Sequence, residues 1–215
     1  MLQEGVNTAL YSKLEQDLGP AFVSTPGWAE DVERRARQTQ ETLESNLNHN
    51  KSKLNKESIR TNYNELGEFF YRRGDLNQAM KYFARTRDYC TTNRHVGEMC
   101  LRVIEVAVDL DNFAQVSNYV TKAEHIVDSL EADAKAKLTA AAGLACLKNK
   151  QFKQAALKFL AVTPALGDSF SAVLVVEDVA VYGALCSLAT FDREEVASRN
   201  SIPHLEWEAL VSIVI

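Results

Sequence analysis

The chain has 215 residues, of which 46% are hydrophobic and 25% are charged, as in a folded globular protein with room for one large or two ordinary domains. Its net charge of -5 argues against general nucleic-acid binding, which depends on Lys and Arg side chains that neutralise many phosphates. No apolar run approaches the roughly 20 residues needed to span a bilayer, so neither nucleic acid nor a membrane is an expected partner.

The amino-terminal segment predicts one short helix and a connector. Its first residues, MLQEGVNTALYSKLEQD, lack the basic start and apolar stretch of a secretory signal, which indicates an intracellular protein. A helix is expected from about Asn7 to Asp17, ending near Gly19-Pro20. The segment GPAFVSTPG (19–27) is rich in turn-forming residues and is expected to be a connector.

A long helix is expected next, because no Gly or Pro occurs from Trp28 to about Ser58. Apolar or small side chains recur there at spacings of three, four or seven, which places them on one helix face: Trp28, Val32, Ala36, Thr39, Leu43, Leu47 and Leu54. A helix of this length spans about 45 Å, so part of it is expected to project or to lie along a partner. The alternative is a helix that breaks near NLNHNKSK (46–53).

The stretch LGEFFYRRGDLNQAMKYFARTRDYC (66–90) predicts two helices folded against each other around a tight turn. Its pattern is that of a tetratricopeptide repeat, with Tyr63, Leu66, Gly67 and Phe70 on the first helix and Ala79 and Phe83 on the second. The small Gly67 and Ala79 allow the helices to approach, and the two phenylalanines fill the space between them. Gly74-Asp75 is expected to end the first helix, since Gly tolerates the left-handed conformation found there.

The pattern recurs along the chain. A shift of 37 residues places Val103 on Leu66 and Tyr119 on Tyr82. A shift of 76 residues places Gly143, Ala155 and Phe159 on Gly67, Ala79 and Phe83, and a weaker fourth unit places Gly183 and Phe191 on Gly143 and Phe152. We therefore expect an all-α fold of stacked helical hairpins, an α-solenoid, behind a long amino-terminal helix. The expected parts are amino-terminal helices over 1–58, helical repeats over 59–199, and a further segment over 200–215.

The sequence contains no motif that predicts an enzyme. Neither a Gly-rich phosphate loop nor a His-Glu-x-x-His or Gly-x-Ser-x-Gly pattern occurs, so no catalytic, cofactor-binding or metal-binding residue is assigned. Cys90, His95 and Cys100 have a spacing that could indicate zinc, but a structural zinc site needs a fourth ligand and none is near in sequence. These two cysteines, together with Cys146 and Cys186, are expected to be reduced and buried.

Arginine-rich stretches are the candidate partner-binding surface. Its members are Arg72, Arg73, Arg85, Arg87, Tyr89 and Arg94, and the stretch with Arg34, Arg35 and Arg37 is a further candidate of the same kind. The alternative for each stretch is a solvated helix face with acidic neighbours. Chaperone-docking tetratricopeptide arrays capture a carboxylate with Lys and Asn side chains. At the corresponding positions this chain has Asn64, Glu68, Arg102, Lys137 and Ala141, of which only Lys137 fits, so such a clamp is not expected.

The segment IRTNYNELGEFFYRRGDLNQAMKYFARTRDYCT (Ile59–Thr91) resembles the family that contains subunit one of the COP nine signalosome and a homologous proteasome-lid subunit. The run RTRDYCT (85–91) favours the signalosome member, and AAGLACLKNKQFKQAALKFL and VAVYGALCSLATFDREE strengthen the match. The resemblance covers roughly Leu10 to Arg199. Members of this family continue into a PCI module, so 200–215 is expected to begin a truncated continuation toward it.

The resemblance implies a non-catalytic scaffold subunit of the complex that removes Nedd from cullins and so regulates cullin-RING ubiquitin ligases. Its partners would be other signalosome subunits, and cullin-RING ligases or regulators, in the nucleus and cytoplasm, with no small-molecule substrate. Two alternatives remain open. One is the homologous lid subunit of the proteasome regulatory particle, and the other is a free-standing tetratricopeptide adaptor that binds a peptide.

Overall fold

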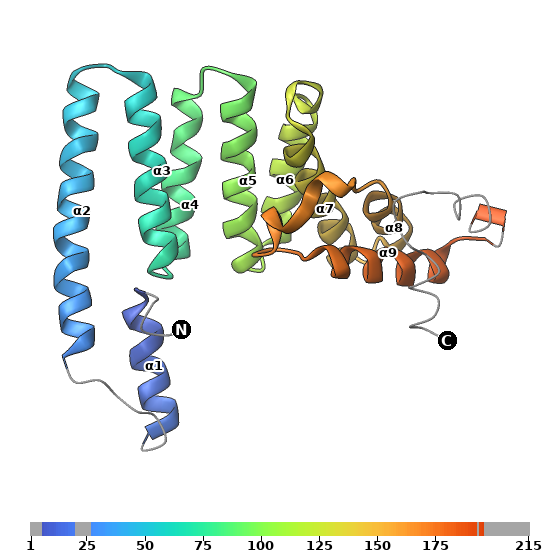
Figure 1. Cartoon of the computed structure of the whole chain (residues 1–215), viewed down its shortest axis with the longest axis horizontal. Coiled ribbons are helices and arrows are strands. Elements are labelled where there is room, and N and C mark those ends of the chain that lie inside the picture. Colours follow the sequence, from blue (N-terminus) through green and yellow to red (C-terminus); the bar gives the residue numbers. More distant parts are fainter. Residues whose placement is uncertain (1–5, 20–26, 193, 196–215) are drawn as a thin grey trace. The chain divides into compact units, whose positions relative to one another are not determined.

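The computed structural model describes residues 6–19, 27–192 and 194–195, and within these residues every regular element is a helix (Figure 1). The predicted all-α class of helical-hairpin repeats is confirmed. The chain divides into two compact units, Met1–Thr91 and Thr92–Ile215. Most of the predicted connector and the whole of 200–215 lie outside the described residues. None of the helices described is both long enough and apolar enough to cross a membrane.

The first unit begins with α1 (Thr8–Leu18), which matches the helix predicted from Asn7 to Asp17. Asn7 caps it, because its side chain accepts a hydrogen bond from the Leu10 N–H at 3.0 Å. Three further helices, α2 (Trp28–Ser52), α3 (Lys56–Arg72) and α4 (Leu76–Arg85), pack in sequence order, and a 3₁₀ turn (Thr86–Tyr89) follows α4. In this unit α1 packs against α2, and the hydrophobic core lies between α2, α3 and α4.

The long helix is shorter than the sequence predicts. It ends at Ser52 rather than Ser58, so the alternative of a break at the NLNHNKSK segment is the one that the structure supports. Leu54 adopts a left-handed conformation with φ 55°, and Asn55 starts α3 by accepting a hydrogen bond from the Ser58 N–H at 3.2 Å. The prediction that Leu54 lies on the packed face is therefore wrong, since 82% of this residue is exposed.

The second unit is a run of hairpins in which each helix packs on the next. Its helices are α5 (Asn93–Asp109), α6 (Phe113–Glu124), α7 (Ala132–Lys148), α8 (Phe152–Leu160) and α9 (Val176–Thr190), with 3₁₀ segments at Val127–Ser129 and Pro164–Phe170. α5 begins 37 residues after α3 and α7 begins 76 residues after α3, which confirms both predicted shifts. Its fully buried side chains include Val103, Ile104, Val106, Val116, Phe159, Leu166 and Phe170.

The same kind of three-residue turn joins α2 to α3, α3 to α4, α5 to α6 and α7 to α8. Its middle residue is left-handed in all four cases: Leu54 (φ 55°), Gly74 (φ 79°), Asp111 (φ 54°) and Lys150 (φ 60°). In the turns at Gly74, Asp111 and Lys150, the N–H of the following residue donates a hydrogen bond back to the preceding helix. These bonds run from Asp75 to the Phe70 carbonyl, from Asn112 to the Ala107 carbonyl and from Gln151 to the Cys146 carbonyl, at 2.9–3.0 Å. This bond satisfies a helix-terminal carbonyl, so one short turn ends one helix and starts the next.

Candidate interaction surfaces

Two helix seams place a glycine against a phenylalanine ring. A Cβ atom at Gly67 would lie 2.6 Å from a ring carbon of Phe83, and a Cβ at Gly143 would lie 2.6 Å from a ring carbon of Phe159. Ala79 and Ala155, on the same helices as the two rings, are fully buried. Because no side chain fits between ring and backbone, α3 approaches α4, and α7 approaches α8, more closely than a larger residue would allow.

The fourth predicted repeat differs from the others. Gly183 lies on α9, and a Cβ there would be 3.2 Å from the Cβ of Phe159, so Phe159 packs between Gly143 on one side and Gly183 on the other. Phe191 is the residue at which α9 ends, whereas Phe152 is the first residue of α8. The alignment of Phe191 with Phe152 is therefore wrong. Gly183 serves the packing of α9 onto the preceding hairpin.

An aromatic cluster joins α3, α4 and the 3₁₀ turn that follows α4. The ring of Tyr63 stacks on Tyr89 with centroids 5.5 Å apart, and Phe70 stacks on Tyr82 at 5.2 Å and 8°. Leu66 is fully buried in the same cluster. Burial raises the pKa of the Tyr82 phenol above its usual range. Tyr89, a predicted surface residue, is half-buried and presents only part of its ring to solvent.

The adjacent arginines Arg72 and Arg73 point in different directions. The Arg72 guanidinium is exposed and pairs with Glu68 on its own helix at 3.1 Å. Arg73 reaches across to α2 and pairs with Glu33 at 2.7 Å, and only 19% of its side chain is exposed. The hydrogen bond from Arg73 lowers the pKa of the Glu33 carboxyl, which also accepts a hydrogen bond from the Thr8 hydroxyl at 3.4 Å. Arg73 thus links α2 and α3 inside the first unit, which the sequence spacing did not reveal.

The remaining predicted arginines belong to two different units. Arg85 and Arg87 are exposed at the end of the first unit, where Arg87 lies 3.8 Å from Asp88. Arg94 lies in the second unit and pairs with Glu98 at 3.1 Å and with Glu131 at 3.2 Å. The Glu98 hydrogen bond raises the pKa of the Arg94 guanidinium above its usual value.

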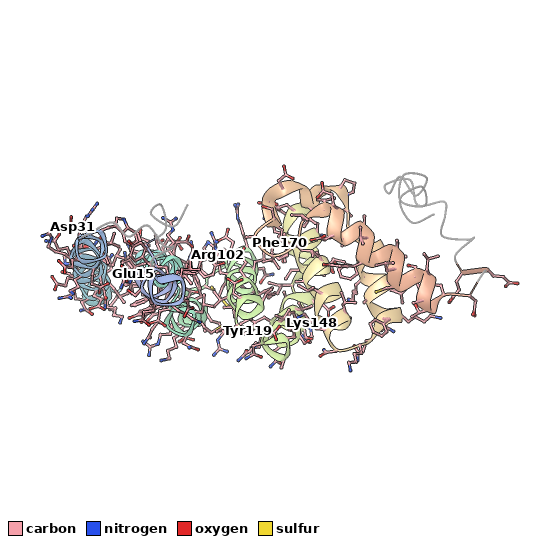
Figure 2. All side chains as sticks on the ribbon, turned by 90° about the horizontal axis from the view of Figure 1, so that it is seen from below. Glu15, Asp31, Arg102, Tyr119, Lys148 and Phe170 are labelled. Carbon is pink, nitrogen blue, oxygen red and sulfur yellow. The ribbon has the colours of Figure 1, made fainter. Side chains whose placement is uncertain are left out.

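A charged groove of about 280 Å³ lies in the second unit between α5, α7 and the 3₁₀ segment that contains Ser169. Figure 2 shows Arg102 on the same side of this unit as Phe170, with Tyr119 and Lys148 on the opposite side. The groove is lined by Arg94, Glu98, Leu101, Arg102, Glu105, Leu130, Glu131, Asp133, Ala134, Lys137 and Ser169. The ion pairs Arg102–Glu105 at 3.1 Å and Lys137–Asp133 at 3.4 Å complete it. Each cation in this groove already faces a carboxylate, so the groove is mixed in charge rather than basic.

The sequence contained a signal for this groove that was not recognised. Arg94–Glu98, Arg102–Glu105 and Asp133–Lys137 are opposite charges three or four residues apart, so each pair lies on one helix face. That α5 and α7 bring the three pairs together depends on helix packing, which spacing within one helix does not show.

Among the residues that the structure describes, no group of three or more His, Cys, Asp or Glu side chains is arranged so that it could hold a metal ion. All four cysteines are free thiols. Cys100 and Cys186 are buried, while Cys90 and Cys146 are half-buried. Burial raises the pKa of the Cys146 and Cys186 thiols, which keeps them protonated and less reactive.

Comparison with known proteins identifies a family and several relatives. A family model described as the 26S proteasome subunit RPN7 matches residues 25–199. COP9 signalosome complex subunit 1 of Arabidopsis thaliana is 43% identical over 202 residues, which cover 92% of this chain and 46% of the relative. Subunit 1b of Drosophila melanogaster is 42% identical over 182 residues, which cover 82% of this chain and 34% of the relative. Subunit 1 of Emericella nidulans is 36% identical over 205 residues (92% and 41%).

The chain therefore spans less than half the length of these curated relatives. Among solved structures, the crystal structure of BtubC (BKLC) from P. vanneervenii matches with a TM-score of 0.59 and 13% sequence identity. The match covers 90% of this chain and 84% of that one. At this low identity the likeness shows a shared helical fold and nothing about function.

Proposed function

Because the chain belongs to the family of the 26S proteasome subunit RPN7, we propose that it is the helical-repeat part of a COP9 signalosome subunit and acts as a non-catalytic scaffold. The observation that carries the proposal is the 43% identity with subunit 1 of the Arabidopsis thaliana signalosome over 92% of this chain. Identity of this order over a whole repeat array supports a shared place in an assembly more strongly than fold alone does.

The distribution of buried and charged side chains in the structure supports a scaffold role. Buried residues form seams between helices, as at Gly143 and Phe159, and some of the charged residues, such as Arg94 and Arg102, form ion pairs along helix faces. In this role the chain would present helical surfaces to other signalosome subunits, and to cullin-RING ligases or their regulators. The removal of Nedd from cullins would be the chemistry of another subunit, and the site of action would be the nucleus and cytoplasm.

Affinity purification from cells tests the proposal. A tagged full-length protein that contains this chain, and the 215-residue chain alone, are purified under mild conditions, and co-purifying proteins are identified by mass spectrometry. We expect signalosome subunits with the full-length protein, together with an activity that cleaves Nedd from cullins. The chain alone then shows whether the repeats are sufficient for assembly. Recovery of proteasome-lid proteins and a deubiquitylating activity instead would contradict the proposal and select the lid alternative.

A peptide-binding adaptor is a second candidate, and the groove between α5 and α7 is the observation that favours it. A peptide with both acidic and basic side chains could replace the internal ion pairs at Arg102 and Lys137 by pairing its own charged groups with the groove residues. If this function is correct, titration with a peptide library yields one short motif that binds with micromolar Kd, and Arg102→Ala weakens it. The control is Arg72→Ala, which removes an exposed ion pair within one helix outside the groove.

A further inference from the structure

A cluster of cations lies at one end of the first unit, where α2 ends, α3 begins and α4 ends (Figure 1). We call this surface the basic tip. It consists of Lys51, Lys53, Lys56, Arg85 and Arg87, together with the exposed Leu54. Neither the family nor the names of the relatives assign a role to it.

Contacts through the aromatic cluster bring the two sides of the basic tip together. The Lys51 ammonium lies 5.2 Å from the centre of the Tyr63 ring, and Tyr63 stacks on Tyr89, which belongs to the same 3₁₀ turn as Arg87. Lys51 and Arg85 both act electrostatically on the Tyr82 phenol. The carboxyl-terminal ends of α2 and α4 therefore lie beside the same aromatic cluster.

Positive charge exceeds negative charge on this surface. Lys51, Lys53, Lys56 and Arg85 form no ion pair with any other side chain of the described residues, and Arg87 reaches only Asp88, at 3.8 Å. Of the nearby carboxylates, Glu57 is neutralised by Arg60 at 2.6 Å, whereas Glu44 accepts a hydrogen bond from the neutral Gln40 at 2.9 Å and keeps its charge. The cations still outnumber the carboxylates. This differs from the groove of the second unit, where each cation is neutralised, in a chain whose net charge is -5.

Two residues of the basic tip are unfavourable for the folded chain. Lys56 is the first residue of α3, where the positive end of the helix dipole disfavours a cation. Leu54 is left-handed, which is costly for a residue with a branched side chain, and it leaves an apolar group 82% exposed. Lys51 and Lys53 stabilise the fold, because they lie at the negative end of the α2 dipole. Lys56 and Leu54 make no such contribution to the stability of the fold. Local features that oppose stability are often found at functional surfaces.

We propose that the basic tip binds an acidic segment of a partner protein in which an apolar residue lies next to the carboxylates. The carboxylates would pair with Lys53, Lys56, Arg85 and Arg87, and the apolar residue would contact Leu54. The apolar contact at Leu54 would exclude water from the neighbouring ion pairs, and each kind of contact would therefore strengthen the other. A nucleic acid fits the same cations less well, because the negative charge of the rest of the chain repels a long phosphate backbone. The inference does not depend on which assembly the chain joins.

Fluorescence anisotropy with short labelled probes tests the proposal on the 215-residue chain. The main probe is a peptide of alternating Glu and Leu residues. The comparison probes replace every Glu by Gln, replace every Leu by Ser, or are single-stranded oligothymidylate. We expect the Glu-Leu peptide to bind most tightly, with an affinity that falls as salt is added.

Lys56→Glu is the decisive variant, because it places an acidic residue at a helix start and therefore should not reduce folding. We expect it to weaken the Glu-Leu peptide about tenfold, since one attraction becomes a repulsion. The control is Lys150→Glu, which makes the same charge change at the exposed middle residue of another three-residue turn, and we expect less than about a twofold effect. Leu54→Ser should weaken the Glu-Leu peptide about threefold and leave the Glu-Ser peptide unchanged.

Three outcomes would overturn the proposal. Equal effects of Lys56→Glu and Lys150→Glu would show that binding reflects overall charge rather than a site. Tighter binding of oligothymidylate than of the Glu-Leu peptide would assign the surface to nucleic acid. A Glu-Leu peptide that binds no better than the Glu-to-Gln peptide would show that the cations recognise no carboxylate.

Discussion

At the scale of single residues, the same chemical device appears twice, 76 residues apart. Gly67 and Gly143 each face a phenylalanine ring so closely that a Cβ atom would lie 2.6 Å from a ring carbon. Real Cβ atoms do not approach a ring carbon to this distance, so an added methyl group must push the ring or the helix aside. Sequence spacing could predict which residues meet here, because a glycine and an aromatic side chain at repeat positions already imply a close approach.

Gly143→Ala tests this device. We expect it to lower the free energy of unfolding by about 1–3 kcal/mol, because the added methyl group overpacks the seam with Phe159. Urea denaturation followed by circular dichroism measures the change. Phe159→Leu should also destabilise the chain when it is made alone. In the double variant Gly143→Ala with Phe159→Leu, the loss of unfolding free energy should be smaller than the sum of the two single losses, because the smaller side chain leaves room for the methyl group. Additive costs would show that the glycine does not act through this ring.

The ion pair between Arg73 and Glu33 should make stability depend on pH. The Glu33 pKa in the folded chain lies below its ordinary value of 4.5, because Arg73 stabilises the carboxylate. Stabilisation is therefore fully present above about pH 4.5 and is lost as the pH falls through the lower folded pKa. The unfolding free energy of the wild-type chain should fall more steeply below pH 4.5 than that of Arg73→Gln.

The neighbouring residue supplies the control for this experiment. Arg72→Gln removes an i,i+4 pair of 3.1 Å whose guanidinium is exposed, so its pH dependence should follow the wild-type chain. If Arg72→Gln and Arg73→Gln have the same pH dependence, the buried position of Arg73 has no special effect on Glu33.

At the scale of helices and turns, the hairpins share one backbone arrangement but differ in how their second helices start. Asp75 and Asn112 cap α4 and α6 with side-chain hydrogen bonds of 3.1 Å and 3.2 Å. Gln151 occupies the same place before α8 and makes no such bond. The backbone bond across the turn is present in all three, so the side-chain cap adds to a turn that is already formed.

Asn112→Ala should therefore cost about 1 kcal/mol of unfolding free energy, whereas Gln151→Ala at the matched position should change it little. Thermal denaturation of both variants measures the difference. Gln151→Asp should stabilise the chain by a similar amount, since Asp is a preferred cap residue. Equal losses from Asn112→Ala and Gln151→Ala would show that the side-chain bond is not what Asn112 contributes.

Sequence reasoning located most helices but misplaced the end of α2. The signals that worked were glycine and aromatic spacing, together with the Gly74-Asp75 break. The end of α2 was missed because the left-handed residue there is Leu54, and a leucine gives no turn signal. Asn55, followed by an acidic residue in the first turn of α3, was the available sign of a helix start.

The candidate surfaces were less accessible to sequence reasoning than the helices. Arg85 and Arg87 were singled out, but Lys51 and Lys56 were not, because these lysines reach the same surface only through a hairpin that the sequence reading had replaced by one long helix. The inward direction of Arg73 depends on the rotation of α2 and α3 about their axes. The Pro164–Phe170 segment, which buries Leu166 and Phe170, is too short to show a periodic pattern.

At the scale of the whole molecule, the chain consists of two units with separate internal packing. In repeat proteins each repeat contacts mainly its neighbours, so stability is close to a sum of local terms. Damage at one place should therefore spread to adjacent helices and decline along the chain.

Phe159→Ala tests this expectation, because Phe159 packs against both α7 and α9 and its removal should cost about 3–5 kcal/mol locally. Hydrogen exchange measured by mass spectrometry should increase in α7, α8 and α9 and remain near the wild-type rate in α2 and α3. An equal increase in all helices would indicate one cooperative unit.

The constant length of one part of each hairpin limits how the chain can change. α3, α5 and α7 each have 17 residues and each leads into a three-residue turn, whereas α4, α6 and α8 have 10, 12 and 9 residues. One inserted residue rotates the rest of a helix by about 100° relative to its neighbour, which would turn an apolar face toward solvent. Insertions, tags or labels should therefore be tolerated better in the segments that follow α4, α6 and α8, away from packed residues such as Tyr89, Leu166 and Phe170, than at the tight turns.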